Sequence, residues 1–173
     1  DQGFYLGEHG WYDKRFIYDE SFKTPLMIRW PNKIKPGISS EEMVQNLDFA
    51  QTFLEAAMIS APSDMQGESL IPLMTGENSK WTRESVYYHY YEYPSVHMVK
   101  RHYGIVNKEY KLAHFYYDVD EWELYDRIND PNEMNNVYND PNYANVVKKL
   151  TQELKELRIK YKDSEELDKK FIY

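Results

Sequence analysis

The sequence predicts an α/β fold in which a short buried parallel strand precedes an antiparallel sheet and a terminal helix. An apolar run over residues 24–30 lies between two prolines and fits a strand inside a parallel sheet, because such strands are covered on both faces. Four later segments are rich in valine, tyrosine and phenylalanine, which favour strands. Residues 140–161 carry an apolar stripe at helical spacing, which predicts a helix packed on that sheet.

The first half of the chain is expected to contain few regular elements. Residues 4–21 show no sustained periodicity and should form mainly loop. A helix is predicted over residues 48–57, where Asp48 is a suitable N-cap and apolar residues recur at helical spacing. A brief helix is expected over residues 68–74, and a further short strand at residues 43–44.

The second half is expected to form the antiparallel sheet. Its predicted strands cover residues 86–91, 102–106, 110–115 and 122–126. A hairpin at residues 107–109 should join the second strand to the third. Asp130-Pro131-Asn132-Glu133 has the N-cap, proline and glutamate pattern of a helix start. The composition changes near residue 78, so we expect two domains, residues 1–78 and residues 79–173.

Composition bounds the function. The 173 residues are enough for one domain or slightly more, and 42% hydrophobic with 29% charged residues is a globular composition. A net charge of −8 argues against a nucleic acid or an anionic membrane surface as partner. There is no cysteine, which excludes disulfides and thiolate metal sites, and no apolar run long enough for a membrane span.

The chain opens with two adjacent oxygen ligands, the carboxylate of Asp1 and the amide of Gln2. Hard cations such as calcium and magnesium prefer such donors. Gly3 allows the backbone turn that would bring both side chains to one ion. An ordinary turn is the alternative interpretation of these three residues.

These opening residues, followed by Gly7-Glu8-His9-Gly10 and by Lys14, resemble the start of the C-terminal half of a type I sulfatase. Those enzymes depend on formylglycine and belong to the alkaline phosphatase superfamily. The resemblance continues in two further signatures, Gly67-Glu68-Ser69-Leu70-Ile71-Pro72-Leu73 and Leu124-Tyr125-Asp126 with Asp130-Pro131-Asn132-Glu133. It implies the C-terminal part of an alkaline-phosphatase-like parallel sheet with helices, followed by a small four-stranded antiparallel sheet packed with a C-terminal helix.

The resemblance also implies a site. Asp1 and Gln2 would bind one calcium ion, Lys14 would contact the sulfate, and His9 would line the pocket as a donor to sulfate or sugar. The formylglycine nucleophile comes from a Cys/Ser-x-Pro-x-Arg motif, which does not occur in these residues. We therefore expect an N-terminal half of the same protein as partner, and a periplasmic, extracellular or lysosomal-type compartment from the family.

A second candidate patch is the cationic and aromatic run that contains Arg101 and His102. In sulfatases, loops of the small sheet border the pocket, so these two residues are candidates for contacts with a sulfated glycan. A surface strand with neutralising cations is the alternative. The remaining histidines have no metal-like spacing and are interpreted as structural.

Three functions remain open from the sequence. The first is hydrolysis of a sulfate ester on a carbohydrate, with a resemblance to sulfatases that act on glucosamine 6-sulfate. The second is phosphodiester or phosphonate hydrolysis in the same superfamily, although such enzymes usually use two metals with several histidine ligands. The third is a binding or interaction module, and we expect the 173 residues alone to be inactive.

Overall fold

The computed structural model describes residues 2–170, and their contacts divide them into two compact units. One unit consists of residues 2–25 and 87–170, and the other of residues 26–86. The expected division at residue 78 does not follow these units, because residues 2–25 pack with the sheet. The domain organisation of the intact protein stays a prediction. Among the described residues, no helix has both the length and the hydropathy that a membrane span requires.

The first unit is built around a four-stranded sheet with strand order β1-β2-β3-β4. Its elements are η1 (Glu8–Gly10), α1 (Asp19–Phe22), β1 (Ser85–Tyr90, which begins at the unit boundary), β2 (His102–Asn107), β3 (Tyr110–Phe115), β4 (Glu121–Asp126), η3 (Pro141–Tyr143), α4 (Ala144–Lys160) and α5 (Glu165–Lys170). All four predicted strands are confirmed within one residue at each end. The antiparallel pairing of β2 with β3 and of β3 with β4 confirms the predicted antiparallel sheet and its hairpin at residues 107–109.

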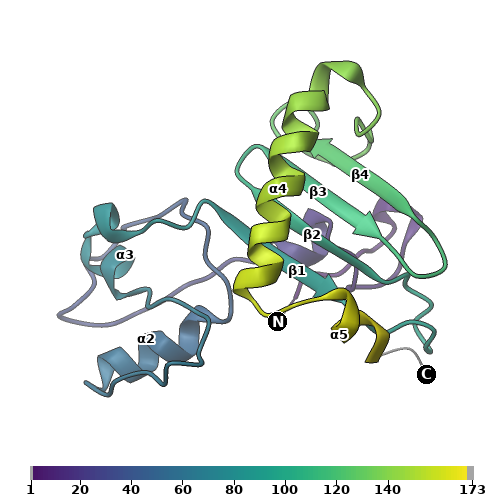
Figure 1. Ribbon diagram of the computed structural model, residues 1–173. Helices are drawn as coiled ribbons and strands as arrows, with labels where there is room; N and C mark the ends of the chain where they lie inside the picture. The colour runs from purple at the N-terminus through teal and green to yellow at the C-terminus, as the bar shows by residue number, and fades with distance from the viewer. Residues whose placement is uncertain (1, 171–173) are drawn as a thin grey trace. The chain divides into compact units, whose positions relative to one another are not determined.

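The sheet is the middle layer of this unit (Figure 1). Helix α4 crosses one face of the sheet. There its Leu150 and Leu154 pack against one residue from each of β2, β3 and β4, namely Ile105, Leu112 and Leu124. The register places Leu112 opposite both Ile105 and Leu124, so the three side chains lie in one row. The predicted apolar stripe of this helix is therefore confirmed as a core contact.

Residues 2–25, called the N-terminal segment below, cover the other face of the sheet (purple in Figure 1). The approach is so close at Gly104 of β2 that a Cβ atom there would lie 2.7 Å from the Ile17 side chain and 2.6 Å from the carbonyl of Leu112. Ile17 is fully buried, as is Tyr5. Side chains alternate across a strand, so one strand face serves α4 and the other serves this segment.

The second unit contains α2 (Asp48–Ala56), α3 (Ile71–Thr75) and η2 (Asn78–Lys80). Leu70, Leu73 and Met74 form its small core. Asp48 accepts hydrogen bonds from Arg83 at 2.5 and 2.8 Å and from the amide of Glu68 at 2.9 Å. Thr52 accepts from the amide of Leu70 at 2.9 Å. The predicted helix at 48–57 is thus confirmed, and its two polar residues hold the following loop.

Three local predictions are wrong. Residues 24–30 and 43–44 form no strand, and Met27 is 91% exposed. A strand needs a hydrogen-bonded neighbour, and none pairs with these residues within the described chain. The segment at Asp130 forms turns instead of a helix, because Glu133 adopts a left-handed conformation with φ of 53°.

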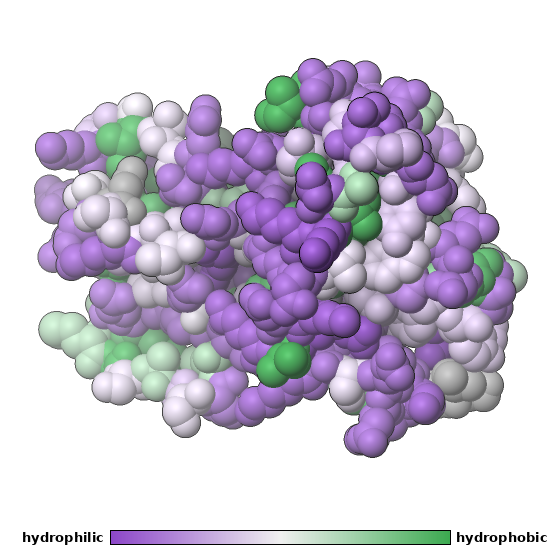
Figure 2. Space-filling view, turned by 45° about the horizontal axis from the view of Figure 1, so that its top comes forward, coloured by the Kyte–Doolittle hydropathy of each residue, from purple (hydrophilic) through white to green (hydrophobic). Residues whose placement is uncertain are grey.

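The exposed side chains over most of the face in Figure 2 are hydrophilic, in keeping with the charge of −8.

His102 lies in the aromatic core between the sheet and the N-terminal segment. Its ring is fully buried and stacks on Phe115 at 4.9 Å and Phe16 at 5.6 Å between ring centroids. Its Nδ1 donates to the carbonyl of Lys100 at 2.8 Å, whereas Nε2 has no hydrogen-bond partner among the described residues. Burial therefore lowers the pKa of His102 to about 4, although the Lys100 carbonyl works in the opposite direction.

This environment predicts acid-sensitive stability. The unfolded chain takes up a proton at His102 near pH 6.5, and the folded chain only near pH 4. The stabilisation is therefore complete above pH 6.5 and is lost as the pH falls from 6.5 towards 4. Between pH 7 and pH 5 we expect this group to cost about 2 kcal/mol of the free energy of unfolding.

Denaturant unfolding of the intact protein at both pH values measures this effect. His102→Asn should lower stability at both pH values and reduce the difference between them. His97→Asn, at an exposed histidine, is the matched control and should keep the difference. Equal pH dependence in wild type and His102→Asn would show that His102 does not titrate as its burial requires.

Candidate functional site

The N-terminal segment folds back on itself and presents His9 and Lys14 from loops. The amide of Tyr5 donates to the carbonyl of Asp13 at 2.8 Å, and the amide of Gly7 to that of Trp11 at 3.0 Å. The Tyr5 hydroxyl reaches the carbonyls of Phe16 and Tyr18 at 3.1 and 3.3 Å. A buried tyrosine thus ties both arms of the loop together, and the predicted loop character of this region is confirmed.

His9 lies in the turn between these arms. Gly7 and Gly10 flank it with φ of 127° and 74°, conformations that glycine adopts without strain. The His9 ring stacks on Tyr18 at 4.4 Å, and its Nε2 lies 3.2 Å from a carboxylate oxygen of Glu20. The ring is therefore oriented by an aromatic face and by a carboxylate, an arrangement suited to a residue that donates a hydrogen bond to a ligand.

Lys14 is half-buried, and its backbone is held from several sides. The Asp13 carboxylate accepts the amides of Lys14 and Arg15 at 2.5 and 2.8 Å. Ser21 donates to the Lys14 carbonyl at 2.5 Å, and the Tyr88 hydroxyl donates to the Arg15 carbonyl at 2.6 Å. These hydrogen bonds fix the position of the Lys14 backbone, from which its side chain extends.

Arg15 pairs with Asp13 at 2.9 Å. The guanidinium of Arg15 is therefore engaged by a carboxylate of the same loop, and it also lies 2.7 Å from Nε2 of His97.

Of the expected metal ligands, Asp1 lies outside the described residues. Gln2 is exposed at the start of the described chain. Gly3, the next residue, donates its amide to the carbonyl of Ser21 at 3.1 Å. A Cβ atom at Gly3 would lie 1.8 Å from the carbonyl oxygen of Glu20, so only glycine fits there. The close approach anchors the start of the chain beside the residues that hold His9 and Lys14.

Arg101 and His102 do not line a surface. Arg101 is 1% exposed and donates to the carbonyls of Tyr93 and Asp168 at 2.5 and 3.1 Å. His102 is 0% exposed within the aromatic core. Neither side chain is accessible at the surface of the described residues, and a contact of either one with a glycan stays a prediction. The structure therefore gives both a part in packing, in contrast to the expected substrate contact.

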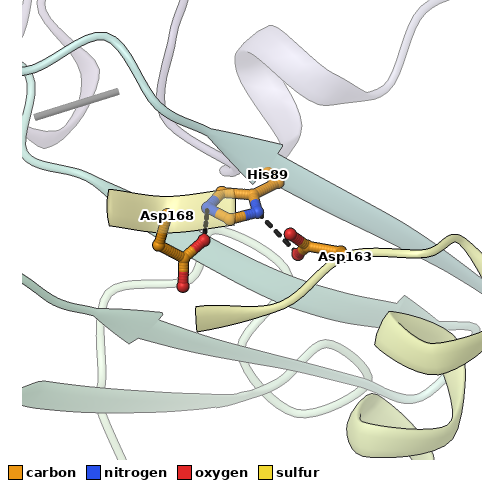
Figure 3. Close-up of side chains that lie close together, drawn as sticks. All are labelled: His89, Asp163 and Asp168. Carbon is orange, nitrogen blue, oxygen red and sulfur yellow. Dashed lines mark hydrogen bonds and ion pairs between the residues drawn. The ribbon is translucent and has the colours of Figure 1, made fainter. Parts of the chain in front are cut away.

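The structure brings together a second group of titratable residues that the sequence spacing did not indicate. His89 of β1 lies between Asp163 and Asp168, which approach opposite nitrogens of its ring at 2.7 and 3.6 Å (Figure 3). Arg158 contacts both carboxylates at 3.2 and 2.9 Å. We call these four residues the His89 cluster. His89 lies far in sequence from the other three members, 74 positions before Asp163, so no local pattern could have identified the cluster.

The His89 cluster has the composition of a metal site but the geometry of an ionic cluster. The carboxylates flank the ring instead of converging on one of its nitrogens, and the Arg158 guanidinium already supplies positive charge. Burial alone would raise the pKa of Asp163, but hydrogen bonds from His89 and Tyr87 and the charge of Arg158 hold it below its ordinary value. The cluster links residues 158–168 to strand β1 of the sheet.

Comparisons with known proteins agree with the sulfatase resemblance. Residues 7–160 match the family model described as N-sulphoglucosamine sulphohydrolase, C-terminal. An N-acetylglucosamine-6-O-sulfatase of Bacteroides thetaiotaomicron is 51% identical over 99% of this chain and 31% of the relative. A solved structure, described as a complex with its substrate D-glucosamine-2-N,6-O-disulfate, is 52% identical with a TM-score of 0.90, over 95% of this chain and 34% of that one.

The fold is shared more widely. A phosphonate monoester hydrolase from Silicibacter pomeroyi has a TM-score of 0.76 at 24% identity, over 88% of this chain and 32% of that one. At that identity the similarity shows a common fold and no more. The chain spans about a third of the length of each of these relatives. By its match to the family model over most of its length, the chain belongs to the C-terminal family of the N-sulphoglucosamine sulphohydrolases, within the sulfatases of alkaline-phosphatase-like fold.

Proposed function

We propose that the intact protein removes sulfate from a sulfated carbohydrate of the glucosamine type. The observation that carries this proposal is the 51% identity to an N-acetylglucosamine-6-O-sulfatase over 99% of the chain. The solved structure at 52% identity was obtained with a disulfated glucosamine as its substrate. Because this chain spans about a third of such proteins, the remaining part of the catalytic site would come from the rest of the same protein.

In this proposal Lys14 supplies a fixed positive charge. Negative charge moves to the leaving oxygen as an S–O bond breaks, and an ammonium group close to the sulfate oxygens stabilises that charge. The hydrogen bonds of Asp13, Ser21 and Tyr88 support this role, because they hold the backbone of the lysine and of the next residue, Arg15, before substrate arrives. Such preorganisation avoids a reorganisation cost during the reaction.

His9 is the proposed hydrogen-bond donor to the sulfate or the sugar. Its stacking on Tyr18 and its contact with Glu20 support the role, since they restrict the ring to one orientation.

The proposed metal ligands are Asp1 and Gln2. The amide oxygen of Gln2 and a carboxylate at position 1 form a donor set that fits a hard divalent ion such as calcium and does not fit a soft metal. When bound, the ion would neutralise sulfate charge and the formylglycine expected from the rest of the protein would supply the nucleophile.

Two alternatives lead to different results in one assay. The intact protein is incubated with glucosamine 6-sulfate, with a phosphonate monoester and with a phosphodiester. Release of sulfate from the first and of an alcohol from the other two is measured. We expect turnover of the sulfate ester to exceed that of the other two. Preferred turnover of the phosphonate or phosphodiester would replace the proposal with the second function, and binding without turnover of any ester would support an interaction module.

Replacing Lys14 by alanine tests the charge. We expect kcat on glucosamine 6-sulfate to fall by about 10²–10³-fold, as for loss of one electrostatic donor, with the unfolding temperature nearly unchanged. Lys148→Ala, at an exposed lysine on α4, is the matched control and should retain full activity. Unchanged kcat in Lys14→Ala would remove this lysine from the site.

Replacing Asp1 by alanine tests the metal. We expect the purified protein to lose bound calcium and activity together, because a charged ligand is removed. Calcium is measured by elemental analysis, and Asp64→Ala, at an exposed aspartate, serves as control. Full calcium content in Asp1→Ala would place the metal on other ligands.

A further inference from the structure

Glu133, the last residue of the Asp-Pro-x-Glu signature, points into the protein. Its residue is 2% exposed, and its left-handed backbone turns the side chain inward, while its amide donates to the Asp130 carbonyl at 3.0 Å. Glutamate is rarely buried unless it is paired. The position therefore requires an explanation in terms of the groups that its carboxylate contacts.

The two oxygens of Glu133 contact different elements. One accepts the backbone amide of Asp19, the first residue of α1, at 2.9 Å. The other lies 2.5 Å from the Lys111 ammonium of β3 and 3.5 Å from Arg127. A single carboxylate thus joins the N-terminal segment to the sheet.

Asp19 closes this arrangement from its own side. Its carboxylate oxygens lie 2.8 Å from Lys111 and 2.6 Å from Arg127. Two acids and two bases therefore form what we call the Lys111 network. Burial would raise the pKa of Asp19, but the charges and hydrogen bonds of Lys111 and Arg127 lower it, so the aspartate stays ionised. Burial lowers the pKa of Lys111, whose side chain is 0% exposed, against the effect of its two carboxylate partners.

The residues next to Asp19 hold both candidate side chains of the site. Tyr18 stacks under the His9 ring, and Glu20 contacts its Nε2. Ser21 donates to the Lys14 carbonyl. All of these contacts arise within two residues of the position that Glu133 and Lys111 fix. A shift of Asp19 would therefore be transmitted to His9 and Lys14 together.

We infer that Glu133 is a positioning residue for the sulfatase reaction, acting through Asp19 on Lys14 and His9. This inference rests on the proposed function of those two residues. The Asp-Pro-x-Glu signature then has a role in the site although Glu133 is remote in sequence from every candidate site residue. The role of Glu133 is to hold the N-terminal segment at a defined position on the sheet.

The test uses Glu133→Gln in the intact protein. The substitution keeps the size of the side chain but removes the charge that faces Lys111. We expect kcat on glucosamine 6-sulfate to fall by about 10-fold to 100-fold under conditions where the variant is folded, because small displacements of a reacting group have effects of that size. KM should change much less than kcat.

A double-mutant cycle separates positioning from general stability. In a Lys14→Ala background, Glu133→Gln should lower kcat by clearly less than it does in the wild-type background, because one of the two groups that it positions is absent. Asp163→Asn is the matched control, since it removes a buried carboxylate whose ionic partners belong to the His89 cluster. It should lower the unfolding temperature and leave kcat of the folded protein unchanged in both backgrounds.

Asp19→Asn provides a second variant if Glu133→Gln does not fold. It breaks the same network at a carboxylate that is 23% exposed, and should show the same coupling to Lys14. Additive losses in the cycle, an unchanged kcat in Glu133→Gln, or failure of both variants to fold would overturn the positioning role. Loss of activity in Lys14→Ala together with additive losses would leave the proposed function intact, whereas full activity in Lys14→Ala would contradict the proposed function itself.

Discussion

The Lys111 ammonium is buried in the sheet, and the rest of the unit is arranged so that this charge is paired. An unpaired ammonium in a protein interior costs several kcal/mol, so its two carboxylate partners stabilise the fold. Glu133 and Asp19 approach it from different parts of the chain. The charge thereby links a strand, a turn and the segment that presents Lys14. In this molecule a requirement of folding also determines where the candidate site lies.

Both faces of the sheet are occupied, and this explains why several polar residues are buried. Helix α4 covers one face with leucines, but the N-terminal segment covers the other with aromatic rings and backbone. Loop backbone carries many carbonyl groups that need donors. Arg101 donates to the carbonyls of Tyr93 and Asp168, and His102 donates to that of Lys100, so both serve the loop before β2 and helix α5. Their chemistry resembles that of ligand-binding residues, but it is used to satisfy carbonyl groups of the protein itself.

The second unit has a small core and several exposed apolar side chains. Its core is small, and the buried pair of Asp48 and Arg83 holds its helix to the following loop. Met27 and Met58 are more than nine-tenths exposed. The relatives are about three times as long as this chain, which agrees with a partner elsewhere in the same protein.

The sequence by itself determined the four antiparallel strands, the helix at 48–57, the long helix α4 and the family, because these depend on local periodicity and on short contiguous signatures. Only the tertiary structure decided which side chains face inward. From sequence, Arg101 could be a surface cation, but in the structure it is enclosed and donates to the carbonyls of Tyr93 and Asp168. Glu133 belongs to a predicted helix start, but its left-handed backbone directs its side chain towards Lys111. Burial depends on which elements face each other, and sequence spacing contains little information about contacts between residues a hundred positions apart.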